Sequence, residues 1–176
     1  MGLKLARAIA GLCLAGMATT AFAQDQSTNR VAAKTDWSVF VEDNPTECWG
    51  VSAPKESVNT RDGRVVAVKR GDILLFVFFR PKAGVNGQVT FTGGYPFAGG
   101  STVNMNISGN QFELISDGEW AWPASPEDDA KIVAAMKNGT EAVLTARSAR
   151  GTQTKDTFSL LGFTAALEDA QKRCAN

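Results

Sequence analysis

The chain has 176 residues, of which 44% are hydrophobic and 20% charged, with 18 basic and 18 acidic side chains and no histidine. This length and composition are typical of one globular domain with a sizeable core. The zero net charge argues against a nucleic-acid partner, because phosphate binding needs an excess of Lys and Arg. The lack of histidine in the sequence excludes Ser-His-Asp and Cys-His catalytic devices and His-ligated metal sites.

The first 23 residues have the three-part pattern of a secretory signal peptide. Lys4 and Arg7 form a charged start, residues 8–17 form an apolar segment too short to anchor in a bilayer, and residues 21–23 provide a small-x-small cleavage site. We predict cleavage after Ala23 and a periplasmic or secreted protein with no transmembrane segment after signal removal. The signal carries two basic and no acidic side chains, so the mature net charge would be −2.

The remainder is predicted to be a flexible lead-in over residues 24–34 and a single domain over residues 35–176. Most of that domain alternates apolar and polar residues, and residues 73–79 are apolar throughout, as in a buried strand. The predicted strands cover residues 37–41, 48–52, 64–69, 73–79, 89–92, 102–107, 111–116, 141–147 and 154–160. Short strands with Gly-rich connections indicate a sandwich or a small barrel, and we favour an all-β fold, an antiparallel, jelly-roll-like β-sandwich with two short peripheral helices.

Two segments have helical patterns. The first has Ser125 as N-cap and Pro126 at the first helical position, and it stops at Asn138-Gly139. The second runs from about Thr164 to Cys174, where apolar residues spaced three and four apart share one face.

Two cysteines remain in the mature chain, Cys48 and Cys174, because Cys13 lies in the signal. In an oxidising compartment such a pair predicts a disulfide, which would join the last helix to an early strand and remove on the order of 5 kcal/mol of unfolded-state entropy. Two free buried thiols are the alternative.

Several motifs resemble those of the invasion-associated locus B family. They are the opening Asp36-Trp37-Ser38-Val39 followed by Cys48, the helix with Asp128-Asp129, and the segment Phe158–Leu167 with its Ser-Leu-Leu-Gly-Phe core. The resemblance implies a small exported alphaproteobacterial protein with an all-β fold and no established biochemical activity. It also implies an envelope or host-surface protein as the partner, and hence an association with host interaction.

The candidate binding residues are aromatic and lie in predicted loops. Tyr95 and Phe97 sit between Gly-Gly pairs, and Trp120 and Trp122 follow an acidic turn. Aromatic faces beside carboxylates can stack on sugars or contact protein partners. The alternative is that these rings plug the ends of the sandwich.

Other motifs have simpler explanations. Arg70-Gly71-Asp72 is the tripeptide that integrins bind, but Gly-Asp between two strands favours a turn. The close carboxylate pairs, Asp117 with Glu119 and Asp128 with Asp129, are explained by a turn and by helix capping. We therefore predict no catalytic residue, no metal site and no cofactor. The expected function is a non-catalytic envelope or surface interaction protein, with a glycan-binding module as the alternative.

Overall fold

The structure is a computed structural model that describes residues 29–44 and 46–175; the predicted signal peptide lies outside this range. The described part contains two α-helices, α1 (Pro126–Asn138) and α2 (Phe163–Cys174), and a 3-10 turn η1 (Pro81–Ala83). The strands are β1 Arg30–Lys34, β2 Trp37–Asp43, β3 Thr46–Ser52, β4 Glu56–Arg61, β5 Arg64–Val65, β6 Leu74–Arg80, β7 Val85–Thr92, β8 Thr102–Ile107, β9 Asn110–Asp117, β10 Trp120–Trp122, β11 Glu141–Arg147 and β12 Gln153–Ser159. None of the helices in this part of the chain is long and apolar enough to cross a membrane.

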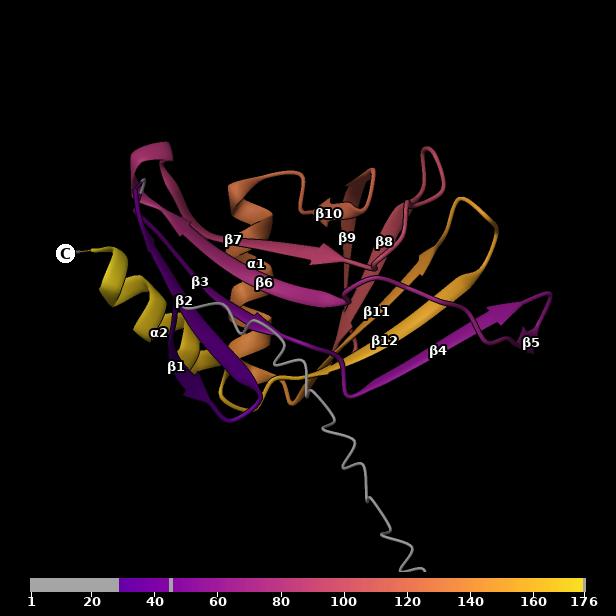
Figure 1. Cartoon of the computed structure of the whole chain (residues 1–176), viewed down its shortest axis with the longest axis horizontal. Helices are drawn as coiled ribbons and strands as arrows, with labels where there is room; N and C mark the ends of the chain where they lie inside the picture. Colours follow the sequence, from indigo (N-terminus) through magenta and orange to yellow (C-terminus); the bar gives the residue numbers. More distant parts are fainter. Residues whose placement is uncertain (1–28, 45, 176) are drawn as a thin grey trace, which may run out of the picture.

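The twelve strands form one antiparallel sheet in the order β1-β2-β3-β6-β7-β10-β9-β8-β11-β12-β4-β5 (Figure 1). The predicted all-β class is confirmed, although the strands are hydrogen-bonded into a single sheet rather than two. The sheet curves so far that Phe91 of β7 meets Phe158 of β12, with ring centroids 6.0 Å apart, although four strands lie between β7 and β12 in the sheet order. Right-handed strand twist accumulates over so many strands, so one long sheet can enclose a core as a sandwich does.

The core lies on the concave face of the sheet. Alternate residues of the strands point inward, and those with no exposed surface include Val39, Val77, Phe91 and Leu144. Helix α2 packs against β2, β3 and β6, and α1 packs against β7 and contacts α2. In Figure 1 both helices lie under the half of the sheet that contains β2, β3, β6 and β7, while β4 and the β11–β12 hairpin extend away from them.

The predicted helix boundaries are confirmed to within one residue. Ser125 caps α1, since its hydroxyl accepts a hydrogen bond from the Asp128 backbone N–H at 3.2 Å. Helix α2 begins one residue earlier than predicted, at Phe163. The Cys48–Cys174 disulfide is also present and joins β3 to the end of α2, with a Cα–Cα distance of 5.8 Å.

The motifs that carry the family resemblance contact each other at the start of α2. The Trp37 indole N–H donates to the Ser159 carbonyl at 3.0 Å, and the Trp37 ring meets the Phe163 ring edge-on at 5.0 Å between centroids. Gly162 lies against the backbone of β1, where a Cβ atom would be 1.9 Å from the Lys34 carbonyl oxygen. The glycine of the Ser-Leu-Leu-Gly-Phe motif is therefore required by a backbone contact.

Several sequence predictions differ from the structure, and β4 was not predicted at all. Residues 30–34 of the predicted lead-in form β1, which pairs with β2 because edge pairing does not require an apolar pattern. The predicted strand over residues 64–69 is reduced to β5, and residues 66–73 have no regular structure. The predicted aromatic loop at residues 120–122 is the short strand β10 between β7 and β9.

Candidate binding pocket

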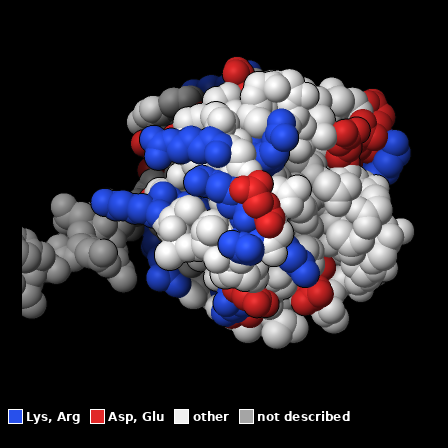
Figure 2. All heavy atoms as spheres, turned by 90° about the vertical axis from the view of Figure 1, so that its right-hand side faces the viewer, with Lys and Arg blue, Asp and Glu red and all other residues white. Residues whose placement is uncertain are grey.

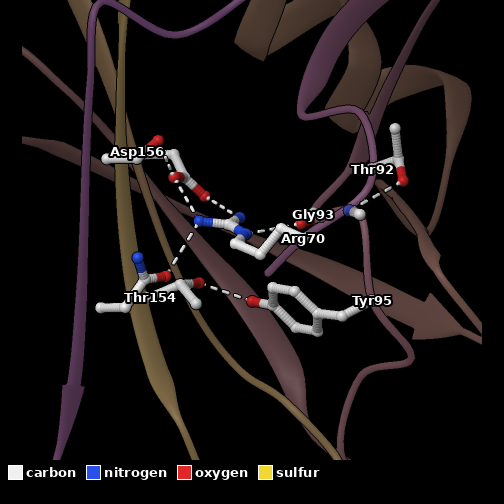
Figure 3. Close-up of polar contacts among 9 residues, drawn as sticks. Arg70, Thr92, Gly93, Tyr95, Thr154 and Asp156 are labelled. Carbon is white, nitrogen blue, oxygen red and sulfur yellow. Dashed lines mark hydrogen bonds and ion pairs between the residues drawn. The ribbon is translucent and has the colours of Figure 1, made fainter. Parts of the chain in front are cut away.

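A buried ion pair holds together the end of the sheet remote from α2. The Arg70 guanidinium donates two hydrogen bonds to the Asp156 carboxylate of β12, at 2.8 and 2.6 Å, and the two side chains are only 6% and 0% exposed. Arg70 also donates to the Gly93 carbonyl at 2.8 Å and to Asn59 at 3.2 Å, while Ser57 donates to Asp156 at 2.7 Å (Figure 3). Each nitrogen of the Arg70 guanidinium and each oxygen of the Asp156 carboxylate thus has a hydrogen-bond partner, as burial of two charges requires.

Tyr95 lies beside this ion pair. Its hydroxyl is 2.5 Å from the Thr154 hydroxyl, and the Arg70 guanidinium lies 5.0 Å from the centroid of its ring (Figure 3). Burial raises the pKa of the Tyr95 phenol above its ordinary value, and the hydrogen bond with Thr154 opposes that rise. Tyr95 therefore stays protonated and fixed in orientation at neutral pH.

Two glycines bring the chain segments of this region together. The Gly71 N–H donates to the Gly94 carbonyl at 2.9 Å. A Cβ atom on Gly94, which has a φ of +70°, would lie 2.6 Å from the Gly71 carbonyl carbon and oxygen. Any side chain at Gly94 would separate the Arg70 segment from the Tyr95 loop, so this backbone contact positions both residues.

Around Tyr95 the surface is hollowed into a pocket of about 460 Å³. Its walls come from the end of β4, the Arg70 segment, the Tyr95 loop, the β9–β10 turn and the β11–β12 hairpin. The charged side chains that line it are Arg61, Lys69, Arg70, Glu119 and Arg150. Figure 2 looks onto this side of the molecule, and Lys and Arg side chains predominate over the centre of the view. The pocket is thus concave, and its charged side chains are mainly basic.

The four predicted binding aromatics do not share one surface. Tyr95 lines the pocket, but Phe97 is 6% exposed and packs edge-on against Tyr95, at 5.2 Å between centroids, as part of the core. Trp120 is 44% exposed on the convex face of the sheet, where its ring lies 5.9 Å from that of Phe76. Trp122 is half-buried in β10 and does not line the pocket.

Trp120 ends a row of aromatic rings that crosses the convex face, which we call the outer aromatic row. Neighbouring rings in the row are 5.1 to 6.0 Å apart. The members are Phe40 of β2, Trp49 of β3, Phe78 and Phe76 of β6, and Trp120 of β10. Because this row and the pocket are distinct surfaces, they have to be considered as separate candidate sites.

The Arg-Gly-Asp tripeptide is not displayed as a recognition loop. Arg70 is held by the buried Asp156, and Gly71 is packed against Gly94. The tripeptide has a structural role, as predicted, although it lies in an irregular segment rather than in a turn between two strands.

The two members of each close carboxylate pair, Asp117 with Glu119 and Asp128 with Asp129, have different surroundings. Glu119 lines the pocket, whereas its predicted companion Asp117 does not. Asp128 accepts hydrogen bonds from Lys131 at 2.8 Å and from the Ser125 hydroxyl at 2.9 Å, and both bonds lower the Asp128 pKa. Asp129 accepts a hydrogen bond from the Val89 N–H at 2.7 Å, and burial raises its pKa to about 6. No cluster of three or more Cys, Asp and Glu suited to a metal ion occurs in residues 29–44 and 46–175.

Most pocket residues were missed by sequence analysis. Arg61, Lys69 and Arg150 resemble any exposed basic side chains, and they come from segments far apart in the chain. Asp156 lies in the predicted strand 154–160, at a position that faces the core. A charged residue at an inward position was the one signal in the sequence that could have indicated a buried ion pair.

Comparisons with known proteins confirm the resemblance suggested by the motifs. The model of the family described as invasion associated locus B (IalB) protein matches residues 121–171, which include α1, β11, β12 and most of β10 and α2. The fold is similar to that of invasion associated protein B from Bartonella henselae, with a TM-score of 0.55 and 16% sequence identity over 82% of this chain and 98% of that chain. No curated protein matches the chain in sequence. The family match covers the helix-bearing C-terminal part, and the structural likeness extends the shared fold to most of the chain.

Proposed function

We propose that this protein is an exported, non-catalytic interaction protein of the bacterial envelope, related to the IalB proteins. The match to residues 121–171 and the shared fold support the relationship. The signal-peptide pattern at the N-terminus supports export. Since the fold alone does not specify a function, the binding role has to be argued from a site.

The observation that carries the binding role is the pocket of about 460 Å³ beside Tyr95. Small-molecule sites are concave, have volumes on the order of 300–1,000 Å³ and are largely preformed. Here the walls are held by the buried Arg70–Asp156 pair, and the Ala149 N–H donates to the Pro96 carbonyl at 2.9 Å. A rigid pocket binds without first having to become ordered.

The side chains that line the pocket favour binding over catalysis. Basic side chains outnumber acidic ones on its walls, where Glu119 is the one carboxylate, and burial raises the pKa of the Tyr95 phenol above its ordinary value. Such groups orient and hold a ligand, whereas general acid–base catalysis needs a group that exchanges its proton near the working pH.

Export is tested by mass spectrometry of the protein recovered from the periplasm and the medium of an expressing Gram-negative cell. The proposal predicts a mature N-terminus at Gln24. Binding is tested by titrating the mature protein with envelope saccharides and following amide chemical shifts. Saturable shifts around Tyr95 are expected, and the absence of shifts with all ligands would contradict a binding role for the pocket.

A contact with an envelope or host-surface protein is the second candidate, and the outer aromatic row favours it. Trp120 is 44% exposed, and so is Ile115 of β9, which pairs with Trp122 two residues further along β10; aromatic residues are enriched in protein interfaces. A photo-crosslinking amino acid at position 120 should capture one discrete envelope or host-surface protein, and Phe76→Ala should weaken that capture. The same amino acid at exposed Leu161, beside α2, is the control and should capture none. Equal capture from positions 120 and 161 would contradict this candidate.

A further inference from the structure

We infer that the pocket beside Tyr95 binds an acidic saccharide, a ring sugar that carries a carboxylate. This inference rests on the proposed binding function and specifies the ligand. It is carried by two features of the same pocket: an excess of cations, and a carboxylate and hydroxyl groups among the other residues that line it.

The excess positive charge comes from three side chains. Arg61, Lys69 and Arg150 line the pocket and are exposed, and none of them forms an ion pair within residues 29–44 and 46–175. Arg70 does not add to this excess, because Asp156 neutralises it. Glu119 is the one acidic side chain among the pocket-lining residues. A ligand with at least one negative charge therefore complements the site.

Arg61 is already partly oriented toward the pocket wall. One of its terminal nitrogens donates to the Thr152 hydroxyl at 2.7 Å, and Thr152 is 4% exposed. The guanidinium has five N–H groups in a fixed planar arrangement, so the others stay available for a carboxylate.

The remaining wall suits hydroxyl groups. Glu119 offers acceptor oxygens, and Tyr95 and Pro96 provide apolar surface. The Ser148 and Thr152 hydroxyls of the β11–β12 hairpin already accept hydrogen bonds from the Thr152 N–H and from Arg61, so their O–H groups are left to donate to a ligand. A sugar ring presents hydroxyls around its edge and C–H groups on its faces. A sugar acid thus matches both features of the pocket, whereas inorganic phosphate matches only the charge, and an acidic peptide lacks the ring of hydroxyls.

The two sides of the pocket are fixed relative to each other. The Tyr95 loop and the β11–β12 hairpin are joined by a β-bridge between Phe97 and Ser148 and by a hydrogen bond from the Ala98 N–H to the Arg147 carbonyl at 2.9 Å. The backbone of the Tyr95 loop and that of the hairpin that carries Arg150 are therefore held in place before a ligand arrives. This preorganisation permits discrimination between a sugar acid and a neutral sugar.

The chain contains a single tyrosine, which provides a specific probe. Mature, oxidised protein labelled with 3-fluorotyrosine gives one ¹⁹F signal, from Tyr95. It is titrated with D-glucuronate and with D-glucose, which differ only in the carboxylate. We expect a saturable shift with glucuronate and an apparent affinity for glucose at least about tenfold lower, because a charge-assisted hydrogen bond is lost.

Variants of the cations then test the assignment. Lys69→Gln and Arg150→Gln should each weaken glucuronate binding by about tenfold while leaving the ¹⁹F signal of the free protein in place. Lys82→Gln is the matched control, because Lys82 is an exposed lysine of η1 outside the pocket, and it should bind like the wild type.

The possible outcomes distinguish a failure of the acidic-saccharide inference from a failure of the proposed binding function of the pocket. Equal binding of glucose and glucuronate would overturn the acidic ligand and leave the pocket as a binding site. An equal shift with inorganic phosphate would overturn the saccharide, and a shift with tetraglutamate but not with glucuronate would reassign the pocket to an acidic peptide. If none of these probes moves the Tyr95 signal, both the inference and the proposed function of the pocket fail.

Discussion

The two ends of the curved sheet are built from opposite kinds of interaction. At one end α2 covers β2 and β3 with apolar contacts, exemplified by Trp37 against Phe163, and a disulfide closes the junction. At the other end no helix packs within the described residues, and polar groups occupy the interior, centred on Arg70 and Asp156. The helix-covered end stabilises the fold, and the open end leaves a cavity with defined chemistry.

The two ends also differ in how they are encoded. The helix-covered junction is formed by two short continuous motifs, one around Trp37 and one around Gly162, which touch in space. The open end is assembled from five separate segments. Resemblance to a family through short motifs therefore reports on the shared fold, while the pocket is free to differ among proteins of that fold.

The largest expected effect is at the disulfide. Replacing both cysteines, Cys48→Ala with Cys174→Ala, should lower the free energy of unfolding by about 5 kcal/mol in the chain-entropy model, because the closed loop spans most of the chain. Urea denaturation of the oxidised wild type and of the double variant measures it. A loss of less than about 1 kcal/mol would show that the helix-covered end does not depend on its covalent link.

Gly162→Ala should have the next largest effect. The added Cβ would clash with the Lys34 carbonyl, and the residue holds a φ of +89°, so α2 must shift from β1 at a cost of about 4 kcal/mol. Gly151→Ala is the matched control, because its φ is +81° but nothing lies within 4 Å of its Cβ position. It should cost only about 1 kcal/mol by the same urea measurement. If both variants lost the same free energy of unfolding, the effect of Gly162→Ala would come from backbone strain alone and not from the contact with Lys34.

The open end is tested by removing one member of its ion pair. Asp156→Ala leaves the Arg70 guanidinium buried without its counter-charge and should lower the free energy of unfolding by about 3 kcal/mol. The double variant Arg70→Met with Asp156→Leu removes both charges, and it should recover most of that stability because paired burial of charge adds little on balance. If the double variant unfolds as easily as the single one, the pair contributes through its packing rather than its charge.

The smallest effect is expected at Asp129, between the two ends. Its pKa in the folded protein, about 6, lies above the ordinary 3.8, so the folded state holds the proton more tightly. Folding stability from this group is therefore complete below pH 3.8 and is lost as the pH rises through about 6. Asp129→Asn keeps an acceptor for the Val89 N–H but cannot ionise. The free energy of unfolding of the variant, relative to that of the wild type, should therefore be about 1 kcal/mol higher at pH 8 than at pH 4.

Urea denaturation of this variant and the wild type at both pH values checks the direction. Asp128→Asn is the control with the opposite sign. Its lowered pKa, which comes from Lys131, means that the charged form favours folding, so the variant should be less stable at pH 8. If the stability of both variants relative to the wild type changed in the same direction between pH 4 and pH 8, the assigned pKa shifts of Asp128 and Asp129 would be contradicted.

The sequence predicted local structure well where the residues of a segment contain the whole signal for its conformation. Helix α1 follows from Ser125 and Pro126, and β11 from its alternating pattern over residues 141–147, and both were found with the predicted bounds. The disulfide followed from two cysteines and a predicted export signal. Strand β1 was missed because an edge strand needs only backbone partners.

The candidate site was mostly not predictable from the chain. Tyr95 was predicted to be a binding residue in a loop, and it lines the pocket. Phe97 was predicted to be one as well, but it is buried in the core, and no local sequence pattern distinguishes the two residues. Arg70 and Asp156 are separated by 86 residues, so their pairing depends on the topology of the whole sheet. Long-range pairing of polar groups leaves no periodic signal in the sequence.

The division between a stabilising end and a binding end is tested most directly by mapping amide chemical shifts during titration with D-glucuronate. The mature, oxidised protein should show saturable shifts confined to the pocket, at residues such as Lys69, Tyr95, Glu119 and Arg150. The amides of Trp37 and of α2 should not move. Shifts centred on the α2 junction or on the outer aromatic row, or no shifts at saturating sugar, would contradict the account.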